Sequence, residues 1–166
     1  MLIRAIEFSD NVQIANVIRT IFIENKYPKV GTAFADTELD FMFETYSKPR
    51  TCYFVLATPD KVYGGAGIAP IEYINATSIE FVCELQKMYL DDSVRGKGYG
   101  IAIIQKCIEH AKLMGYTKMY LETLSEMEIA QNLYKKIGFE YTNEIVGSTG
   151  HTSCSVKMLL DLNQRN

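Results

Sequence analysis

The sequence predicts an α/β (α+β) fold, in which about four helices pack on a mixed central β-sheet of about seven strands. Three observations support this prediction. Extended segments follow one another between residues 51 and 90, without a helix pattern between them. Strand and helix patterns then alternate as far as residue 138, as they do where crossover helices join parallel strands. Two further extended segments close the chain, so parallel and antiparallel pairs should share one sheet with helices on both faces.

The first part of the chain predicts one strand and two helices. The loose alternation in residues 2–8 indicates a strand, and the Asp-x-x-Gln pattern of residues 10–13 is typical of a helix start. Residues 27–35 are predicted to be a loop, and residues 36–47 a short second helix. The apolar residues of the first helix recur at helical spacing, and they are Ile14, Val17, Ile18, Ile21 and Phe22.

The middle of the chain predicts a hairpin and a third extended segment. Residues 51–57 and 61–71 read as two strands joined by a turn, and residues 78–90 follow as another strand. Closely spaced glycines in the second strand indicate either a close approach of the backbone or a bulge, and the sequence leaves both open. These glycines are Gly64, Gly65 and Gly67.

The last part alternates helices with strands. One helix is marked by Ile104, Cys107, Ile108, Ala111 and Met114, and Gly115 can close it in a left-handed conformation. Residues 117–123 predict a strand, and 139–146 and 154–162 two more. Another helix, which Gly138 stops, is marked by Ile129, Ala130, Leu133, Tyr134 and Ile137.

The composition limits the classes of function. Apolar residues make up 48% of the chain and charged residues 22%, a balance typical of a globular protein. The net charge of −3 argues against nucleic acid as a partner, because such proteins carry a basic face. No apolar run has the length of a membrane span or a signal peptide, so we expect no membrane partner and a mature chain that starts near Met1. No linker or repeat divides the sequence, which predicts a single domain over residues 1–166.

The four cysteines are scattered over the chain and form no Cys-x-x-Cys pair. This arrangement favours neither a zinc site nor a disulfide framework. We interpret them as reduced thiols, and we expect a cytoplasmic protein that needs no metal.

The segment RGKGYG, residues 95–100, stands where a predicted strand gives way to a helix. Glycines at such a junction let several backbone N–H groups converge on one ligand, and the helix dipole favours a negative charge there. Arg95 and Lys97 add positive charge, so the segment predicts a phosphate or pyrophosphate site. Its spacing fits neither the P-loop nor the dinucleotide fingerprint. The alternative is a tight turn flanked by solvated cations.

Two motifs of this sequence resemble those of one known superfamily. RGKGYG matches [Q/R]-x-x-G-x-[G/A], the acetyl-CoA loop signature of the GNAT superfamily of acyl-CoA N-acyltransferases. AQNLYKKIGFE, residues 130–140, is similar to the second signature, a helix with Leu-Tyr followed by Gly-Phe. The two motifs at this spacing are much more specific than either alone. The resemblance is closest between residues 54 and 146, whereas residues 24–50 match no pattern that we can name.

The resemblance implies a fold and a cofactor. The two central parallel strands, 78–90 and 117–123, would splay apart to admit the thioester of acetyl-CoA. The coenzyme A pyrophosphate would be held by backbone N–H groups of Arg95, Gly96, Lys97, Gly98, Tyr99 and Gly100. The pantetheine arm would pair like an extra strand with main-chain groups of Met88, Tyr89 and Leu90. Many family members have Asn where this sequence has Met127, and Asn132 is our candidate to replace that contact.

Acetyl transfer to an amine needs a base, a donor to the oxyanion and a proton for the departing thiolate. An alkylamine with a pKa of about 10.4 is almost entirely protonated at neutral pH, so a base has to take that proton. Glu84, in the strand beside the expected thioester, is the first candidate for the base, and Glu122 is the second. A paired strand-end carboxylate is the alternative interpretation of Glu84. The resemblance implies that Tyr134 is the acid, although its place on an apolar stripe also fits a core residue.

The resemblance therefore implies an N-acetyltransferase that moves an acetyl group from acetyl-CoA to a primary amine of a small molecule or peptide. The alternative is a non-catalytic acyl-CoA-binding sensor or regulatory domain of the same fold. Asp36, Asp40 and Glu44 would suit a cationic acceptor, although an exposed helix face carries the same charges. His151 precedes the last strand and could come near the acceptor. The identity of the acceptor and the oligomeric state, a homodimer included, stay open.

Overall fold

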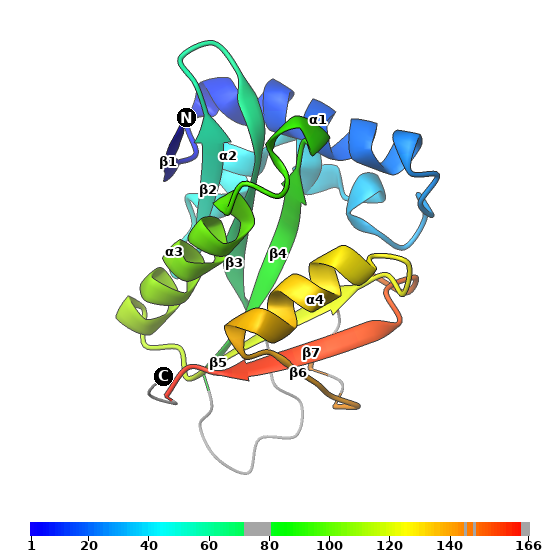
Figure 1. Cartoon of the computed structure of the whole chain (residues 1–166). Coiled ribbons are helices and arrows are strands. Elements are labelled where there is room, and N and C mark those ends of the chain that lie inside the picture. The colour runs from blue at the N-terminus through cyan, green and yellow to red at the C-terminus, as the bar shows by residue number, and fades with distance from the viewer. Residues whose placement is uncertain (72–80, 145, 148, 164–166) are drawn as a thin grey trace.

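Figure 1 shows the computed structural model, which describes residues 1–71, 81–144, 146–147 and 149–163. One mixed sheet contains seven strands in the order β1-β2-β3-β4-β5-β7-β6. These strands are β1 (Leu2–Ala5), β2 (Cys52–Ala57), β3 (Val62–Ile71), β4 (Val82–Leu90), β5 (Lys118–Thr123), β6 (Glu140–Tyr141) and β7 (Val156–Asp161). The α-helices are α1 (Asn11–Glu24), α2 (Met42–Tyr46), α3 (Tyr99–Leu113) and α4 (Glu128–Ile137). The predicted fold class is confirmed.

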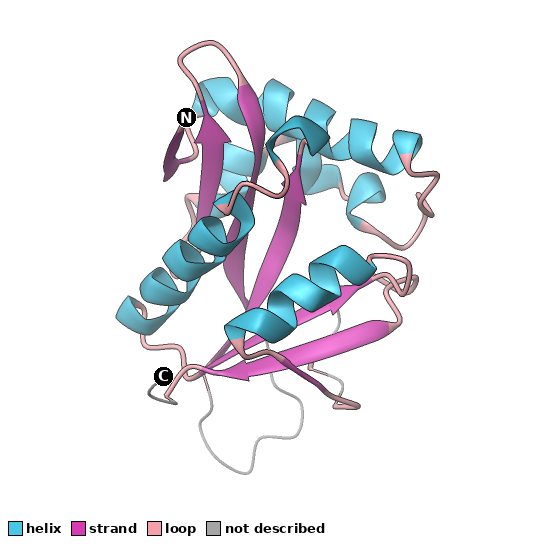
Figure 2. Cartoon of the chain, in the orientation of Figure 1, coloured by secondary structure: helices cyan, strands magenta, loops and turns pink. Residues whose placement is uncertain are grey.

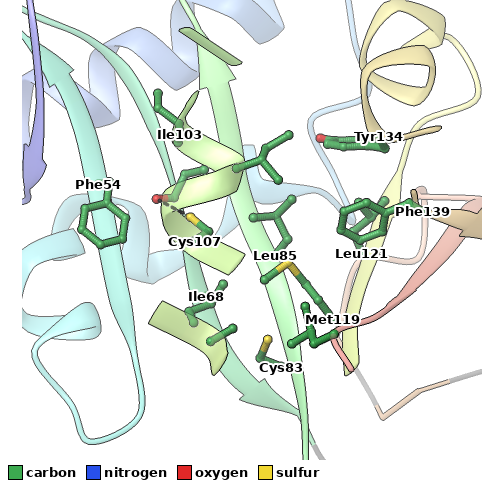
Figure 3. Packing of buried hydrophobic residues seen from close by; sticks show 14 of the residues in the cluster. Phe54, Ile68, Cys83, Leu85, Ile103, Cys107, Met119, Leu121, Tyr134 and Phe139 are labelled. Atoms are coloured by element: carbon green, nitrogen blue, oxygen red, sulfur yellow. Dashed lines mark hydrogen bonds between the residues drawn. The ribbon is translucent and has the colours of Figure 1, made fainter. Parts of the chain in front are cut away.

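Helices cover both faces of the sheet, as Figure 2 shows. Successive residues of β2 point to opposite sides, so Val55 packs in the cluster of α1 while Leu56 packs in the cluster of α3. Figure 3 shows part of the second cluster, in which Ile103 and Cys107 of α3 face Leu85 of β4. Among the described residues, no helix is both long enough and apolar enough to span a bilayer.

The two central parallel strands separate, as the resemblance implied. Strands β4 and β5 pair only from Val82↔Lys118 to Glu84↔Tyr120, although β4 continues to Leu90 and β5 to Thr123. Figure 1 shows the two strands diverging beyond their last pair. The divergence leaves one edge of β4 without a neighbouring strand.

The start of α1 differs from the prediction in its chemistry. Asp10 is buried, but its side chain does not cap the helix. Its oxygens instead accept hydrogen bonds from the guanidinium of Arg4 at 2.6 and 2.9 Å, and from the amide of Glu7 at 2.8 Å. Because its oxygens bind a side chain of β1 and the backbone just before the helix, the carboxylate connects β1 to the start of α1.

Three other elements are shorter than predicted. The strand predicted for residues 2–8 is β1, which ends at Ala5, and a 3-10 turn follows at Phe8–Asp10. Positions 78–80 of the predicted strand 78–90 lie outside the described residues.

Residues 36–47 form a 3-10 turn at Thr37–Asp40 followed by α2, rather than one helix. The predicted strand 139–146 is paired only over β6, and its position 145 lies outside the described residues. Strand β6 is at the edge of the sheet, so it has a partner on one side only.

We expect Asp10→Ala to lower the free energy of unfolding by about 1–3 kcal/mol, because Arg4 loses its partner. Burial opposes ionisation of Asp10, but the hydrogen bonds from Arg4 and Glu7 outweigh it and lower its pKa below the usual 3.8. A carboxylate with a lowered pKa stabilises the fold above its unfolded pKa and loses this effect as the pH falls. Urea unfolding should therefore show a larger difference from wild type at pH 7 than at pH 3. An equal difference at both values would contradict this, and exposed Asp60→Ala is the control.

Candidate functional site

The loop of residues 95–100 leaves open space above the start of α3. Gly96 and Gly98 have φ values of 71° and 84°, a left-handed conformation that side chains disfavour. A Cβ atom at either position would meet no described atom within 4 Å. No described side chain caps α3, so the first N–H groups of the helix stay available to a ligand.

The third glycine of the loop has a different role. A Cβ atom at Gly100 would lie 2.9 Å from Cδ2 of Leu133, so glycine allows α3 to approach α4 closely. Tyr99, the first residue of α3, packs partly against the core. The loop is therefore anchored at its end and open at Gly96 and Gly98.

Both cations of the loop are exposed and held by the backbone. Nε of Arg95 donates to the carbonyl of Leu90 at 2.8 Å, and Nζ of Lys97 donates to the carbonyl of Ser93 at 2.7 Å. Arg95 also forms an ion pair with Asp92, from Nη1 to Oδ1 at 2.5 Å, so Lys97 is the cation of this loop without an acidic partner among the described residues. Open amides, a helix start and two cations together suit a diphosphate.

A small cavity lies in the gap where β4 and β5 diverge. On its other edge β4 pairs with β3, so main-chain groups of the unpaired edge border the gap. Predicted residues Met88, Tyr89, Glu122 and Tyr134 line this cavity, while Leu90 ends the same strand. The sequence offered no sign that Cys154 also lines it.

A β-bulge interrupts β4 beside the cavity. Two residues, Lys87 and Met88, lie opposite the single residue Ala66 of β3. Lys87 adopts a left-handed backbone with φ of 50°, which is uncommon outside glycine. The hydroxyl of Tyr53 donates to the carbonyl of Lys87 at 2.8 Å and supports this conformation.

The glycines of β3 serve both the close approach and the bulge that the sequence left open. Strand β3 is itself bulged, with Tyr63 and Gly64 opposite the single residue Leu56 of β2. A Cβ atom at Gly64 would overlap the carbonyl of Tyr89, and one at Gly67 would overlap the ring of Tyr53. Small residues in β3 therefore let β4 pack against it around the bulge.

Glu84 occupies the last paired position of β4, opposite Tyr120, and is only 4% exposed. Nε2 of Gln86 donates to its Oε2 at 2.6 Å, and the hydroxyl of Tyr46 donates to Gln86 at 2.9 Å. Its Oε1 has no hydrogen-bond partner among the described residues. Burial raises the pKa of Glu84 despite the hydrogen bond from Gln86, so this carboxylate binds a proton more readily than an exposed one.

Glu122 is half-buried, and both of its oxygens are engaged. The hydroxyl of Tyr120 donates to Oε1 at 2.7 Å, and the hydroxyl of Thr149 donates to Oε2. Thr149 in turn accepts the amide of His151 at 3.2 Å. Glu122 therefore binds the segment before β7, whereas Glu84 keeps one oxygen without a hydrogen-bond partner among the described residues.

Tyr134 is buried in α4, with its ring 5.8 Å from that of Phe139. Figure 3 shows its hydroxyl end pointing toward β4. No described residue forms a hydrogen bond with this hydroxyl, and the side chain lines the cavity. Burial raises the pKa of Tyr134, so the hydroxyl stays protonated and is able to donate.

The structure does not bring Asn132 to the cavity. Its side chain is exposed, because a residue two positions before Tyr134 lies on the opposite side of the helix. The buried amide of α4 is Gln131, which donates to the carbonyls of Leu124 and Ser125 at 3.0 Å. Met127 lines the cavity in the place where an asparagine was expected.

The three acids that were candidates for a cationic acceptor are all paired. Asp40 accepts from Arg19 at 2.7 Å, and Glu44 accepts from the side-chain amide of Asn11 at 2.8 Å. Asp36 lies 2.6 Å from Nζ of Lys87. Asp36 and Asp40 are therefore paired with cations, whereas the exposed Glu44 is bound only by a neutral amide.

His151 lies beside the gap, as the sequence allowed, and binds Asp36. Nε2 of His151 is 3.2 Å from Oδ1 of Asp36, across 115 residues of sequence. The hydrogen bond with Asp36 raises the pKa of His151 although burial opposes it. Burial likewise works against ionisation of Asp36, but His151 and Lys87 outweigh it and lower the pKa of Asp36.

A larger hollow lies between α3, α4 and the end of β7. Gln105, Lys112, Lys136 and Asp161 are among its lining residues, and none of the predicted site residues is. The hollow lies near the start of β5, whereas the gap opens at the other end of that strand. Within the described part of the chain, no group of three or more His, Cys, Asp or Glu side chains is arranged to hold a metal ion.

Comparisons with known proteins agree on one family. The model of the acetyltransferase (GNAT) family matches residues 15–139. The Escherichia coli (strain K12) protein named uncharacterized N-acetyltransferase YjgM is 38% identical over 162 residues, which are 97% of this chain and 95% of that protein.

Solved structures share the fold. A GNAT-family acetyltransferase from Staphylococcus aureus Mu50 superposes with a TM-score of 0.81 at 18% identity, over 97% of this chain and 98% of the other. The Salmonella typhimurium protein yncA, solved with its cofactor acetyl-CoA, has a TM-score of 0.74 at 17% identity, over 100% of this chain and 96% of that one.

Proposed function

This chain belongs to the acetyltransferase (GNAT) family, and from that premise we propose that it transfers an acetyl group from acetyl-CoA to a primary amine of a small molecule or peptide. One observation carries the proposal. The gap between β4 and β5 has an open amide loop beside it, a buried carboxylate at its base and a buried hydroxyl on its wall. These are the groups that direct acyl transfer needs.

The residues present suit acetyl-CoA. The amides of residues 95–100 would hold the diphosphate, since the space where Cβ atoms at Gly96 and Gly98 would stand is open. The free edge of β4 at residues 88–90 would pair with the pantetheine arm. Acetyl-CoA supplies the activated thioester, and the chain supplies the proton transfers.

We assign the base to Glu84 and the acid to Tyr134. Glu84 takes the proton that the acceptor amine loses when its nitrogen bonds to the carbonyl carbon. Tyr134 gives its proton to the sulfur when the carbon–sulfur bond breaks. The two groups lie on opposite sides of the sheet. Glu84 is on the side of Gln86 and Tyr46, whereas Tyr134 belongs to α4 on the other side. The base and the acid therefore do not compete for one position.

Gly98→Val should weaken acetyl-CoA binding by about 10–100-fold, because a side chain would enter the open space and displace charge-assisted hydrogen bonds. Gly115→Val is a matched control. Gly115 also has a left-handed φ of 80° with no described atom within 4 Å of a Cβ, but it ends α3 at the opposite end. Calorimetric titration of both folded variants with acetyl-CoA measures the difference. Equal affinities of the two variants for acetyl-CoA would contradict the assignment of residues 95–100 as the diphosphate site.

A thiol-release screen tests the activity itself. Acetyl-CoA is offered with polyamines, free amino acids, aminoglycosides and peptides with free N-termini, and release of coenzyme A is followed. We expect release with at least one class. Tight binding of coenzyme A without release in any mixture would instead support an acyl-CoA sensor.

A further inference from the structure

Three ionisable side chains, Asp36, Lys87 and His151, form a cluster beside the gap. Their side chains are 19%, 7% and 14% exposed. Asp36 lies 2.6 Å from Nζ of Lys87 and 3.2 Å from Nε2 of His151. One carboxylate thus faces two basic groups, and the cluster has surplus positive charge when His151 is protonated.

The cluster also has unused hydrogen-bond donors. A lysine ammonium carries three N–H groups, and among the described residues only Asp36 accepts one from Lys87. Nδ1 of His151 likewise has no partner in the described part of the chain. Buried donors in proteins almost always have an acceptor. Nζ of Lys87 is already satisfied by Asp36, and no fully buried side-chain nitrogen or oxygen of the described residues lacks a partner. The remaining N–H groups of Lys87, which lines the cavity, are thus available to an acceptor group on a ligand.

The bulge is what turns Lys87 toward this side of the sheet. Side chains alternate along a strand, so residue 87 would ordinarily point away from Glu84 and Gln86. The extra residue of the bulge breaks this alternation, and Lys87 reaches Asp36 on the side where Gln86 contacts Tyr46. The left-handed backbone of Lys87 is costly, and such strain is concentrated at functional sites.

The carboxylate of Glu84 lies next to the cluster on the same side. Glu84 keeps its Oε1 without a described partner, and the charges of His151 and Lys87 act on it. Acid and base groups are thus adjacent: a carboxylate that can take an ammonium proton, and donors that can bind an anion.

We propose that the acceptor is a free amino acid, whose amine lies toward Glu84 and whose carboxylate accepts hydrogen bonds from Lys87 and His151. The inference rests on the proposed function and names its substrate class. A polyamine or an aminoglycoside would bring further cations to a cluster that already has two bases, and it would leave the spare donors unused.

The test compares matched acceptors in the thiol-release assay. The panel contains free L-amino acids, the corresponding amino-acid amides and the decarboxylated amines. We expect kcat/KM to be higher for the acids by about tenfold or more, since a site with buried donors discriminates against ligands that lack the acceptor group. Equal or better activity with the amides or amines would overturn the inference but leave the proposed function intact. Release with no amine at all would overturn the proposed function, and the inference with it.

A variant identifies the residues responsible. Lys87→Met should lower the ratio of kcat/KM for an amino acid to kcat/KM for its amide toward one. A general loss of activity affects both values equally, so it does not change this ratio. Lys48→Met makes the same change at an exposed lysine outside the site, and should leave the ratio unchanged. If Lys87→Met does not fold, His151→Gln should lower the same ratio. A wild-type ratio in the folded variants would show that neither residue binds the carboxylate.

Discussion

Glu84→Gln is expected to lower kcat/KM for thiol release by about 10²–10⁴-fold and to leave acetyl-CoA affinity nearly unchanged. Glutamine has the same shape and can still accept the hydrogen bond from Gln86, so the buried strand end should keep its structure. What is lost is the basic oxygen that has no described partner. Steady-state kinetics and calorimetric titration together separate the loss of the base from a loss of binding.

The pH profile gives the same substitution a second readout. A base must be deprotonated to act, so the kcat/KM of the wild type should rise with pH as Glu84 ionises. Burial raises the pKa of Glu84, which places this rise at higher pH than for an exposed glutamate. The Glu84→Gln variant should lack the rise.

Two other substitutions make the result specific. Glu140→Gln changes an exposed carboxylate of β6 and should retain wild-type kinetics. Glu122→Gln should cost less than Glu84→Gln, because both oxygens of Glu122 are already bound by hydroxyl groups. If Glu122→Gln abolished the rising limb while Glu84→Gln kept it, the assignment of the base would be reversed.

Tyr134→Phe is expected to lower kcat by about 10²-fold or more, with acetyl-CoA affinity nearly intact. The hydroxyl has no described hydrogen-bond partner, so its removal should cost the fold little. Its proton is available because burial raises the pKa of Tyr134 and keeps the group neutral. Rapid-mixing kinetics with saturating acetyl-CoA measure the chemical step directly.

Tyr141→Phe is the matched control for this experiment. Its hydroxyl donates to Gln131 of α4 at 2.9 Å but does not line the cavity, and its side chain is 55% exposed. Turnover should be close to wild type. Wild-type turnover in Tyr134→Phe as well would assign the tyrosine to the core, which its apolar position on α4 also allowed.

Much of the site could be anticipated because its signals are local. The glycine loop was recognisable, since left-handed turns and an uncapped helix start depend on residues that are neighbours in sequence. The periodic apolar residues of α3 and α4 located both helices. Asn132 was the exception, because the choice between neighbouring polar residues depends on which side of α4 faces the gap.

Sequence patterns alone were sufficient for the order of strands and helices and for the loop at residues 95–100, whereas Glu84 and Tyr134 became candidates through the resemblance to the family. The patterns were sufficient because apolar periodicity and turn chemistry act over a few residues. The tertiary structure decided that Asp10 pairs with Arg4, that β4 bulges at Lys87, and that Asp36 meets His151. These features depend on which buried polar groups find partners when distant segments pack together, and burial of that kind has no local signature.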